Sequence, residues 1–260
     1  IPFYKKTDPK HLCESIDSIL GQTIIPNTIH LMQDGDISEE LEKLIKKYEK
    51  NYPDLIKTIS LPKKGLPYAL NQSIIKCQTK YYARMDSDDI AFNDRIEKQI
   101  DFLEKNNQID ILGSWAIEFE KDCKLEEGVL NKRPDNPKKI TEYFHYMNPL
   151  VHSSVVFRME VFKKIGLYNE RFYTDQDLEL WARALKKKIN ISNIQDPLLY
   201  FRIAGRHGRR SQFYAIARQI LARYSYNTIS LKLNILKISA IVFRLLPNSV
   251  KEWGYKNLRG

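Results

Sequence analysis

Short apolar runs alternate with segments of helical apolar spacing along the first hundred residues. Strands are expected at residues 1–4, 28–32, 55–61 and 81–85, and helices at 11–20, 39–48, 66–75 and 95–105. Such alternation is typical of βαβ units and a parallel sheet, whose ligands lie at the carboxyl ends of the strands. Three of these strand ends carry polar residues, namely Tyr4, Asp34 and Asp86.

The second half of the chain has a less regular pattern. Strands are expected at residues 109–119, 154–157, 189–194 and 198–203, and helices at 136–147 and 175–185. A basic, glycine-containing loop is expected at 205–210, followed by helices from Phe213 to the end with a break at Pro247. The sequence contains no internal repeat and no low-complexity segment.

An acidic tetrapeptide, Asp86-Ser87-Asp88-Asp89, follows the strand expected at 81–85. Alternating carboxylates at a strand end can aim at one point, and hard divalent ions such as Mg²⁺ and Mn²⁺ prefer oxygen ligands of this kind. The segment also fits an acidic turn that caps the next helix, because Asp94 stands just before an apolar run of helical spacing. The spacing leaves a metal site and a helix cap both open.

Composition narrows the classes of protein. Of the 260 residues, 43% are hydrophobic and 11% aromatic, which is ample for a packed core and argues against disorder. Three widely spaced cysteines signal neither a disulfide framework nor a zinc site, and they fit a reducing cytosol. The net charge of +10 favours polyanionic surroundings such as anionic lipid, diphosphate ligands or nucleic acid.

No membrane span or targeting segment is expected within this sequence. The longest apolar run, residues 238–246, is far shorter than the roughly 20 residues that cross a bilayer. No signal peptide pattern is present, and residues are expected upstream because the chain begins at Ile1 rather than at Met.

Six segments, in order along the chain, resemble the family 2 glycosyltransferases with the GT-A fold. They are Ile1-Pro2-Phe3-Tyr4, Asp34-Gly35, Gly65-Leu66-Pro67-Tyr68-Ala69-Leu70-Asn71, Ala83-Arg84-Met85-Asp86-Ser87-Asp88-Asp89-Ile90, His152-Ser153-Ser154-Val155-Val156-Phe157-Arg158 and Gln176-Asp177-Leu178-Glu179-Leu180-Trp181. The resemblance implies an α/β protein with a Rossmann-like, mostly parallel central sheet flanked by helices. It also implies a nucleotide-sugar-binding half at 1–105, an acceptor-binding half at 106–210 and a basic amphipathic helical extension at 211–260.

The resemblance places the donor nucleotide at the first strand ends. Tyr4 would stack on the base and Asp34 would accept a hydrogen bond from the uracil imide, with Pro2 and Ser87 beside them. Asn71 would offer its amide near the ribose or the diphosphate. Taken alone, Tyr4 also fits a core residue, Asp34 a turn former and Asn71 an exposed helix face.

The acidic tetrapeptide resembles the family's Asp-X-Asp motif. By this resemblance, Asp86 reaches the ribose or the metal, and Asp88 ligates the Mn²⁺ or Mg²⁺ ion that bridges the two phosphates. Asp89 is expected to bond backbone or Arg95, and a role as the helix cap stays open for it.

Asp177 is the expected general base. Attack by a sugar hydroxyl from the face opposite the departing diphosphate inverts the anomeric carbon and needs one carboxylate to take the proton. The family's usual Glu-Asp pair is Gln176-Asp177 in this chain, which leaves Asp177 as the base and Asp175 as its near neighbour. Asp175 is also expected to cap a helix that turns Leu178 and Trp181 inward.

Three further residues are expected near the acceptor or the diphosphate. His152 lies there by resemblance, although a lone histidine ahead of a buried strand also fits a structural hydrogen bond. Arg202 belongs to a segment similar to the family's Tyr-Arg-X-His loop. Ala204 occupies the usual His position of that loop, so His207 is expected to compensate.

The tail from Phe213 combines apolar residues with basic ones such as Lys232, Lys237 and Arg244. Such a segment is typical of a helix that lies on an anionic membrane surface. Helices that pack on the catalytic domain or on a second subunit are the alternative.

The resemblance thus implies an inverting, metal-dependent transferase that moves a hexose from a UDP-sugar to a lipid-linked or free glycan in bacterial surface polysaccharide synthesis, at the inner face of the cytoplasmic membrane. The alternative is a basic nucleic-acid- or membrane-binding protein on an inactive scaffold of the same kind. The presence of both Asp88 and Asp177 counts against an inactive scaffold. Nucleic acid is not an expected partner, because no recognition helix and no run of basic residues interleaved with aromatics is evident.

Overall fold

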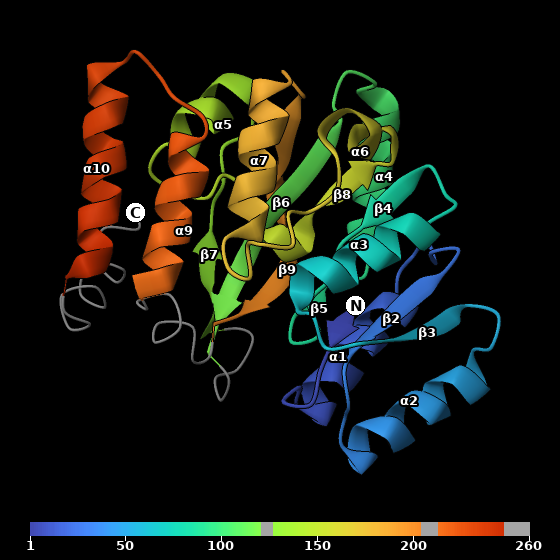
Figure 1. Cartoon of the computed structure of the whole chain (residues 1–260). Coiled ribbons are helices and arrows are strands. Elements are labelled where there is room, and N and C mark those ends of the chain that lie inside the picture. The colour runs from blue at the N-terminus through green and yellow to red at the C-terminus, as the bar shows by residue number, and fades with distance from the viewer. Residues whose placement is uncertain (121–126, 204–212, 247–260) are drawn as a thin grey trace.

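Two β-sheets and the helices around them make up the described part of this computed structural model, residues 1–120, 127–203 and 213–246 (Figure 1). The first sheet has three parallel strands in the order β1 (Pro2–Phe3), β2 (Ile29–Asp34) and β3 (Ile56–Leu61). Helices α1 (Pro9–Leu20), α2 (Glu39–Asn51) and α3 (Leu66–Lys76) follow these strands in turn. The βαβ alternation predicted from the apolar pattern is confirmed.

The second sheet has six strands in the order β4–β8–β6–β9–β5, with β7 paired to β6. Its strands are β4 (Tyr81–Ala83), β5 (Ile90–Ala91), β6 (Ile111–Phe119), β7 (Val129–Asn131), β8 (Val156–Arg158) and β9 (Ile191–Arg202). β6 and β9 are parallel, whereas the other pairs in this sheet are antiparallel. The parallel arrangement therefore holds in the first sheet and along β6 and β9, and the second sheet as a whole is mixed.

Helices cover both sheets. They are α4 (Arg95–Lys105), α5 (Pro137–Phe144), α6 (Glu160–Ile165), α7 (Gln176–Lys186), α9 (Phe213–Tyr224) and α10 (Leu231–Leu245), with a short 3-10 helix at His152–Ser154. α10 packs on α9, α9 on α7, and α7 on α5, so the C-terminal helices stand beside the second sheet (Figure 1). The short elements β5, β7 and α6 were not predicted, because two to six residues carry too little periodicity.

The two strands expected at 189–194 and 198–203 are one continuous strand, β9. Its pairing with β6 shifts register on both sides of Trp115, which lies opposite Pro197. Proline lacks an N–H for the ladder and is tolerated where the pairing is irregular. The proline was therefore a sign of a bulge within a strand and not of a break between two strands.

Side-chain caps explain where several helices begin. The side chains of Asp8, Ser38, Asn136 and Ser230 accept hydrogen bonds from the first-turn N–H groups of α1, α2, α5 and α10. α1 and α5 also carry proline in the first turn, where the missing N–H costs nothing.

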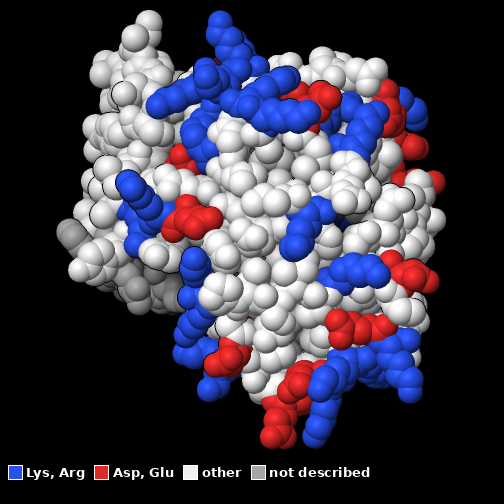
Figure 2. Space-filling model, turned by 45° about the vertical axis from the view of Figure 1, so that its right-hand side comes forward, with Lys and Arg blue, Asp and Glu red and all other residues white. Residues whose placement is uncertain are grey.

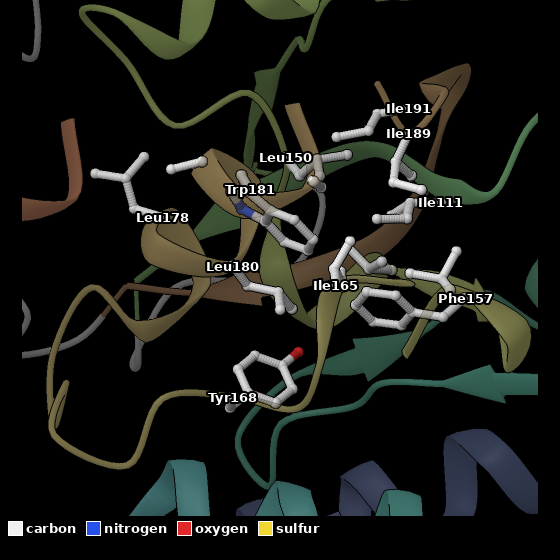
Figure 3. Packing of buried hydrophobic residues seen from close by; sticks show 14 of the residues in the cluster. Ile111, Leu150, Phe157, Ile165, Tyr168, Leu178, Leu180, Trp181, Ile189 and Ile191 are labelled. Carbon is white, nitrogen blue, oxygen red and sulfur yellow. The ribbon is translucent and has the colours of Figure 1, made fainter. Parts of the chain in front are cut away.

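The larger hydrophobic core lies under the second sheet and contains Trp181 at its centre, with Leu150, Leu180 and Phe157 around it (Figure 3). The Trp181 and Phe157 rings stack with their centroids 5.9 Å apart. A second core cluster packs α1 and α2 on the first sheet. β4 pairs with β8, and β5 pairs with β9, so strands from both sides of residue 105 share one sheet. The division of the domain into two halves at that residue stays a prediction.

Charge is dispersed over the face shown in Figure 2. Lys and Arg gather along its upper edge, and basic and acidic side chains lie close together over its lower part. Of the helices in the described part of the chain, none is long and apolar enough to cross a membrane.

Replacement of Trp181 by alanine is expected to lower the free energy of unfolding by about 3–5 kcal/mol, because it empties the centre of the larger core. Urea denaturation followed by circular dichroism measures the change. Ile75→Ala is the matched control, since Ile75 is 62% exposed and its truncation is expected to change stability by less than about 0.5 kcal/mol. Equal losses from the two variants would contradict this view of the core.

Candidate active site

The loop between β4 and β5 gathers three carboxylates. One oxygen from each of Asp86, Asp88 and Asp89 lies within 4.8 Å of the others. A set of close carboxylate oxygens fits a hard divalent ion such as Mg²⁺ or Mn²⁺. Asp89 was not among the residues predicted to hold the metal, yet it belongs to the same group.

A buried arginine precedes this loop. Arg84 forms an ion pair with Asp86, and the Arg84 side chain is almost completely buried. Burial by itself would lower the pKa of Arg84, but the neighbouring Asp86 carboxylate outweighs burial and holds that pKa above its ordinary value. The Ser15 hydroxyl of α1 also donates to the Asp86 carbonyl, at 2.8 Å. The loop is thus fastened at its first carboxylate.

Asp89 fastens the other end of the loop. It is fully buried, and its two oxygens accept hydrogen bonds from the Ser153 hydroxyl and from the backbone N–H of Arg202, the latter at 2.9 Å. The Arg202 guanidinium donates to the Asp88 carbonyl at 2.8 Å and to Glu14 of α1 at 2.6 Å. The expected backbone bond of Asp89 is confirmed, and Arg202 holds the acidic loop against α1.

Neither Asp89 nor Asp94 caps α4 through its side chain. Asp94 occupies the N-cap position, but its side chain makes no capping hydrogen bond and pairs with Lys98 at 2.9 Å. The capping interpretation of the acidic segment is therefore wrong, because the carboxylates of residues 86–89 gather before the helix begins.

The predicted nucleotide residues lie at or beside the strand ends. Tyr4 is 39% exposed just after β1, so the interpretation as a core residue is wrong. Asp34 ends β2, and its carboxylate accepts hydrogen bonds from the backbone N–H groups of Lys64 and Gly65 at the start of α3. Pro2 pairs within the first sheet, opposite Met32.

Asn71 is not exposed, and its amide is already paired with protein groups. Its side-chain nitrogen donates to the Tyr168 carbonyl and to Glu170, both at 2.9 Å. Its side-chain oxygen accepts from the Tyr168 backbone N–H at 2.8 Å. The residue predicted to face the ribose or the diphosphate therefore ties α3 to the segment before α7.

His152 lies near both the acidic loop and α7, since the charges of Asp86 and Asp177 act on it and its ring contacts Trp181. Its Nε2 shares a hydrogen bond of 2.8 Å with the Tyr168 hydroxyl, and its ring lies edge-on to Trp181. Burial, and then the charge of Arg84, lower the pKa of His152 to about 3, while Asp177 and Asp86 act in the opposite direction. The ring is therefore neutral near pH 7.

Asp177 lies in the first turn of α7 and is partly exposed. The Asn148 side chain donates a hydrogen bond of 2.6 Å to Asp177 Oδ2. This contact fixes the direction of the carboxylate. Because the charges of both Asp177 and Asp86 act on His152, the structure brings the predicted base and the acidic loop to one region.

Asp175 takes the N-cap position of α7 in the left-handed region, with φ of 55°, and its side chain makes no capping hydrogen bond. Asp175 therefore stands at the predicted cap position but does not cap the helix through its side chain. Leu178 and Trp181 do turn inward as expected. A non-glycine residue in this region is uncommon and such strain is concentrated at functional sites.

Several residues of this region were missed. Arg84 stands two residues before Asp86 in an extended segment, where residues two apart point to the same face. The sequence alone could therefore have indicated that Arg84 lies beside Asp86. Asn148, Ser153 and Tyr168 meet the site only through contacts distant in sequence. His207 lies outside the described residues.

A cavity of about 650 Å³ lies elsewhere, between β2 and β4. Its walls include His30 and Tyr82, and Pro2 lines it as well. None of the candidate carboxylates lines this cavity, but Arg84 and Met85, which directly precede the acidic loop, do.

Known protein sequences resemble this chain over most of its length. The profile described as "Glycosyl transferase family 2" matches residues 1–166. The chain is similar to "UDP-Gal:alpha-D-GlcNAc-diphosphoundecaprenol beta-1,3-galactosyltransferase" of Escherichia coli, with 33% identity over 98% of this chain and 93% of the relative. It is also similar to "Amylovoran biosynthesis glycosyltransferase AmsE" of Erwinia amylovora, with 32% identity over 78% of this chain and 74% of the relative.

Solved structures resemble the fold at low sequence identity. S. aureus TarS matches with a TM-score of 0.65 and 15% identity over 94% of this chain and 42% of that chain. TarS 1–349 in complex with UDP-GlcNAc matches with a TM-score of 0.67 and 13% identity over 94% of this chain and 71% of that chain. Mannosyltransferase PcManGT from Pyrobaculum calidifontis, in complex with GDP-Man and Mn²⁺, matches with a TM-score of 0.64 and 12% identity over 98% of this chain and 74% of that chain.

Stability is expected to fall as the pH is lowered from about 6.5 to 4. His152 faces Arg84, Asp86, Asp177 and the Tyr168 hydroxyl, and its pKa falls from 6.5 to about 3 in the folded protein. Between these pH values His152 binds a proton in the unfolded chain but stays neutral in the folded protein. The free energy of unfolding therefore falls by at most about 1.4 kcal/mol for each pH unit. Urea midpoints at pH 7, 5.5 and 4.5 measure the slope.

His152→Gln should reduce that slope, because glutamine does not titrate. A slope identical to that of the unaltered protein would contradict the burial of a neutral His152. Other groups account for the remaining slope, and His145 is one of them. Burial, followed by the charges of Lys237 and Arg223, lowers the pKa of His145 to about 4.

Proposed function

Because this chain belongs to glycosyl transferase family 2 and has the GT-A fold, we propose that it moves a hexose from a UDP-sugar to a hydroxyl of a glycan acceptor, with inversion at the anomeric carbon. One observation carries this proposal. The charges of Asp86, in the acidic loop, and of Asp177 both act on one neutral histidine, His152, which supports the closeness of the acidic loop to the expected base. Such an arrangement suits a diphosphate at the acidic loop and an attacking hydroxyl at Asp177.

The donor would occupy the ends of β1, β2 and β4. The exposed ring of Tyr4 is available to stack on a base, and Asp34, Pro2 and Ser87 would complete the nucleoside contacts. Asp34 already binds two backbone N–H groups, and a carboxylate has further lone pairs for an imide donor. The UDP-GlcNAc complex of TarS 1–349 supports a UDP-sugar as donor.

Asp88 and Asp86, with Asp89 beside them, would hold a Mn²⁺ or Mg²⁺ ion. When bound, such an ion neutralises charge on the departing diphosphate. Arg84 pairs with Asp86 and holds it in place, and Arg202 binds the carbonyl of Asp88. The Mn²⁺ in the PcManGT structure supports the choice of ion.

Asp177 would act as the general base. The acceptor hydroxyl oxygen forms a bond to the anomeric carbon, the bond from that carbon to the diphosphate oxygen breaks with its electron pair on UDP, and the hydroxyl proton passes to Asp177. One Asp177 oxygen accepts from Asn148, which leaves the other for the hydroxyl. Neutral His152 would border both reactants without adding charge.

The acceptor would be a glycan, lipid-linked or free, of a bacterial surface polysaccharide. The names of the Escherichia coli and Erwinia amylovora relatives support this choice. A lipid-linked acceptor would place the protein at the inner face of the cytoplasmic membrane. α10 supports such contact, since apolar residues recur on one exposed face of it: Leu231, Ile235, Ile238, Val242 and Leu245.

A panel of nucleotide sugars tests the proposal. The protein is incubated with each donor and Mn²⁺ or Mg²⁺, and both nucleoside diphosphate release and the shift in thermal unfolding are measured. At least one UDP-sugar is expected to raise the unfolding temperature and to be consumed. The absence of any response to UDP-sugars would refute the proposed donor class.

Two matched isosteric variants separate binding from chemistry. Asp177→Asn is expected to keep the metal-dependent thermal shift with UDP-sugar and to lower kcat by about 10²- to 10⁴-fold, because it removes the base. Asp88→Asn is expected to lose the metal-dependent shift itself. An Asp177→Asn protein that transfers sugar at the normal rate would show that another group takes the proton.

Asn148→Ala is expected to lower kcat by about ten- to a hundredfold, because a hydrogen bond to a charged group contributes about 1.5–3 kcal/mol. Without this donor the carboxylate is free to turn away from the acceptor hydroxyl, so kcat falls while donor KM stays unchanged. Steady-state kinetics measures both constants. Asn51→Ala, at the exposed end of α2, is the control, and an unchanged kcat for Asn148→Ala would contradict the positioning role.

A further inference from the structure

Three basic side chains of the C-terminal helices lie inside the protein and are here named the cation cluster. They are Arg223 of α9 and Lys237 and Arg244 of α10. Arg223 is 2% exposed and Lys237 is 0% exposed, while Arg244 is partly exposed. Lys237 was expected on the basic face of a surface helix, so that interpretation is wrong for this residue.

The hydrogen-bond partners of the cluster within the described part of the chain are backbone carbonyls. An Arg223 Nη1–H group donates to the Phe144 carbonyl at the end of α5. Lys237 Nζ donates to the carbonyls of Arg223 and Tyr226 at the end of α9, at 3.1 and 3.0 Å. Cations suit the C-terminal ends of helices, which explains these contacts. Among the described residues, no ion pair includes a member of the cluster.

Other buried nitrogens in this region have no hydrogen-bond partner among the described residues. They are Arg223 Nε, Arg244 Nη1 and His145 Nδ1. A buried donor left unpaired costs about 1–3 kcal/mol, and more when it is charged. Helix-end contacts therefore account for part of the cluster and leave unused donors that an anion would satisfy.

Asp175 and Asp177 act on Arg223, but their charges do not outweigh burial and the neighbouring cations. Burial, and then Arg244, lower the pKa of Arg223 to about 9. Burial, Lys237 and Arg223 together lower the pKa of His145 to about 4. An anion between these groups would relieve repulsion among three cations.

The cluster belongs to the two helices that stand beside α7. α9 packs on α7 and α10 packs on α9 (Figure 1). Arg223 is also near enough to Asp175 and Asp177 for their charges to act on it. Arg223 is thus near the proposed base.

We propose that Arg223, Arg244 and Lys237 form the binding site for the diphosphate of a lipid-linked acceptor, with its hydrocarbon chain along the exposed apolar face of α10. Guanidinium groups bind phosphate oxygens with two parallel N–H donors, and ammonium groups bind them as point charges. The acceptor sugar would then extend from the cluster toward Asp177. This inference rests on the proposed function and identifies its acceptor by the diphosphate group.

Binding of geranyl diphosphate, measured by calorimetry with EDTA present, tests the site without any transfer reaction. Removal of divalent metal leaves the acidic loop unsuited to diphosphate. Arg244→Gln and Arg223→Gln are each expected to weaken binding by about ten- to a hundredfold, as for loss of a charge-assisted hydrogen bond. Arg244 is partly exposed, so its variant keeps the test valid if Arg223→Gln unfolds. Lys232→Gln, exposed on α10, is the control and should bind normally.

Two further ligands and one variant separate the alternatives. Geraniol should not bind, and inorganic pyrophosphate should bind more weakly than geranyl diphosphate with the same dependence on Arg244. Pyrophosphate binding as tight as that of geranyl diphosphate would indicate a free anion and overturn the lipid assignment. The proposed site would be overturned if Asp88→Asn lost geranyl diphosphate binding. It would also be overturned if Arg244→Gln and Arg223→Gln both bound geranyl diphosphate as tightly as the unaltered protein. A protein that binds geranyl diphosphate through Arg244 but consumes no UDP-sugar would refute the proposed function and leave this site standing.

Discussion

Repulsion among the carboxylates of residues 86–89 is the constraint on which the surrounding structure depends. With oxygens within 4.8 Å of one another, each pair of charges costs about 3 kcal/mol or more at an effective dielectric constant of about 20. Two buried arginines offset this cost from opposite ends of the loop, Arg84 through Asp86 and Arg202 through the backbone of Asp88. A carboxylate cluster that the protein neutralises only in part stays attractive to a divalent ion.

The same arginines connect the acidic loop to the rest of the site. Arg202 reaches Glu14 of α1, and its backbone binds Asp89, so the first helix and the end of β9 hold one loop. On the other side, Asn71 holds the Tyr168 backbone, and the Tyr168 hydroxyl holds His152. A rigid chain of contacts therefore runs from the donor side of the site to the region of the proposed base.

Apolar periodicity predicted the elements that are long enough to show it, such as α1, α4 and β3, and it predicted the strand ends where Asp34 and Asp86 lie. It did not predict that strands from both halves share one sheet, because pairing between β4 and β8 depends on residues more than seventy positions apart. The amide of Asn71 illustrates the same limit within the site. Its helix position suggested exposure, yet partners near residue 168 bury it.

The C-terminal helices show how charge counted along a sequence differs from charge placed in a fold. Lys237 contributes to the net charge of +10 like any other lysine, but it lies buried against the carbonyl end of α9. The exposed face of the same helix is apolar instead. A helix that turns cations inward and apolar residues outward is the reverse of a soluble surface helix. This reversal favours a ligand that has an anionic head and a hydrocarbon chain over a simple anionic surface.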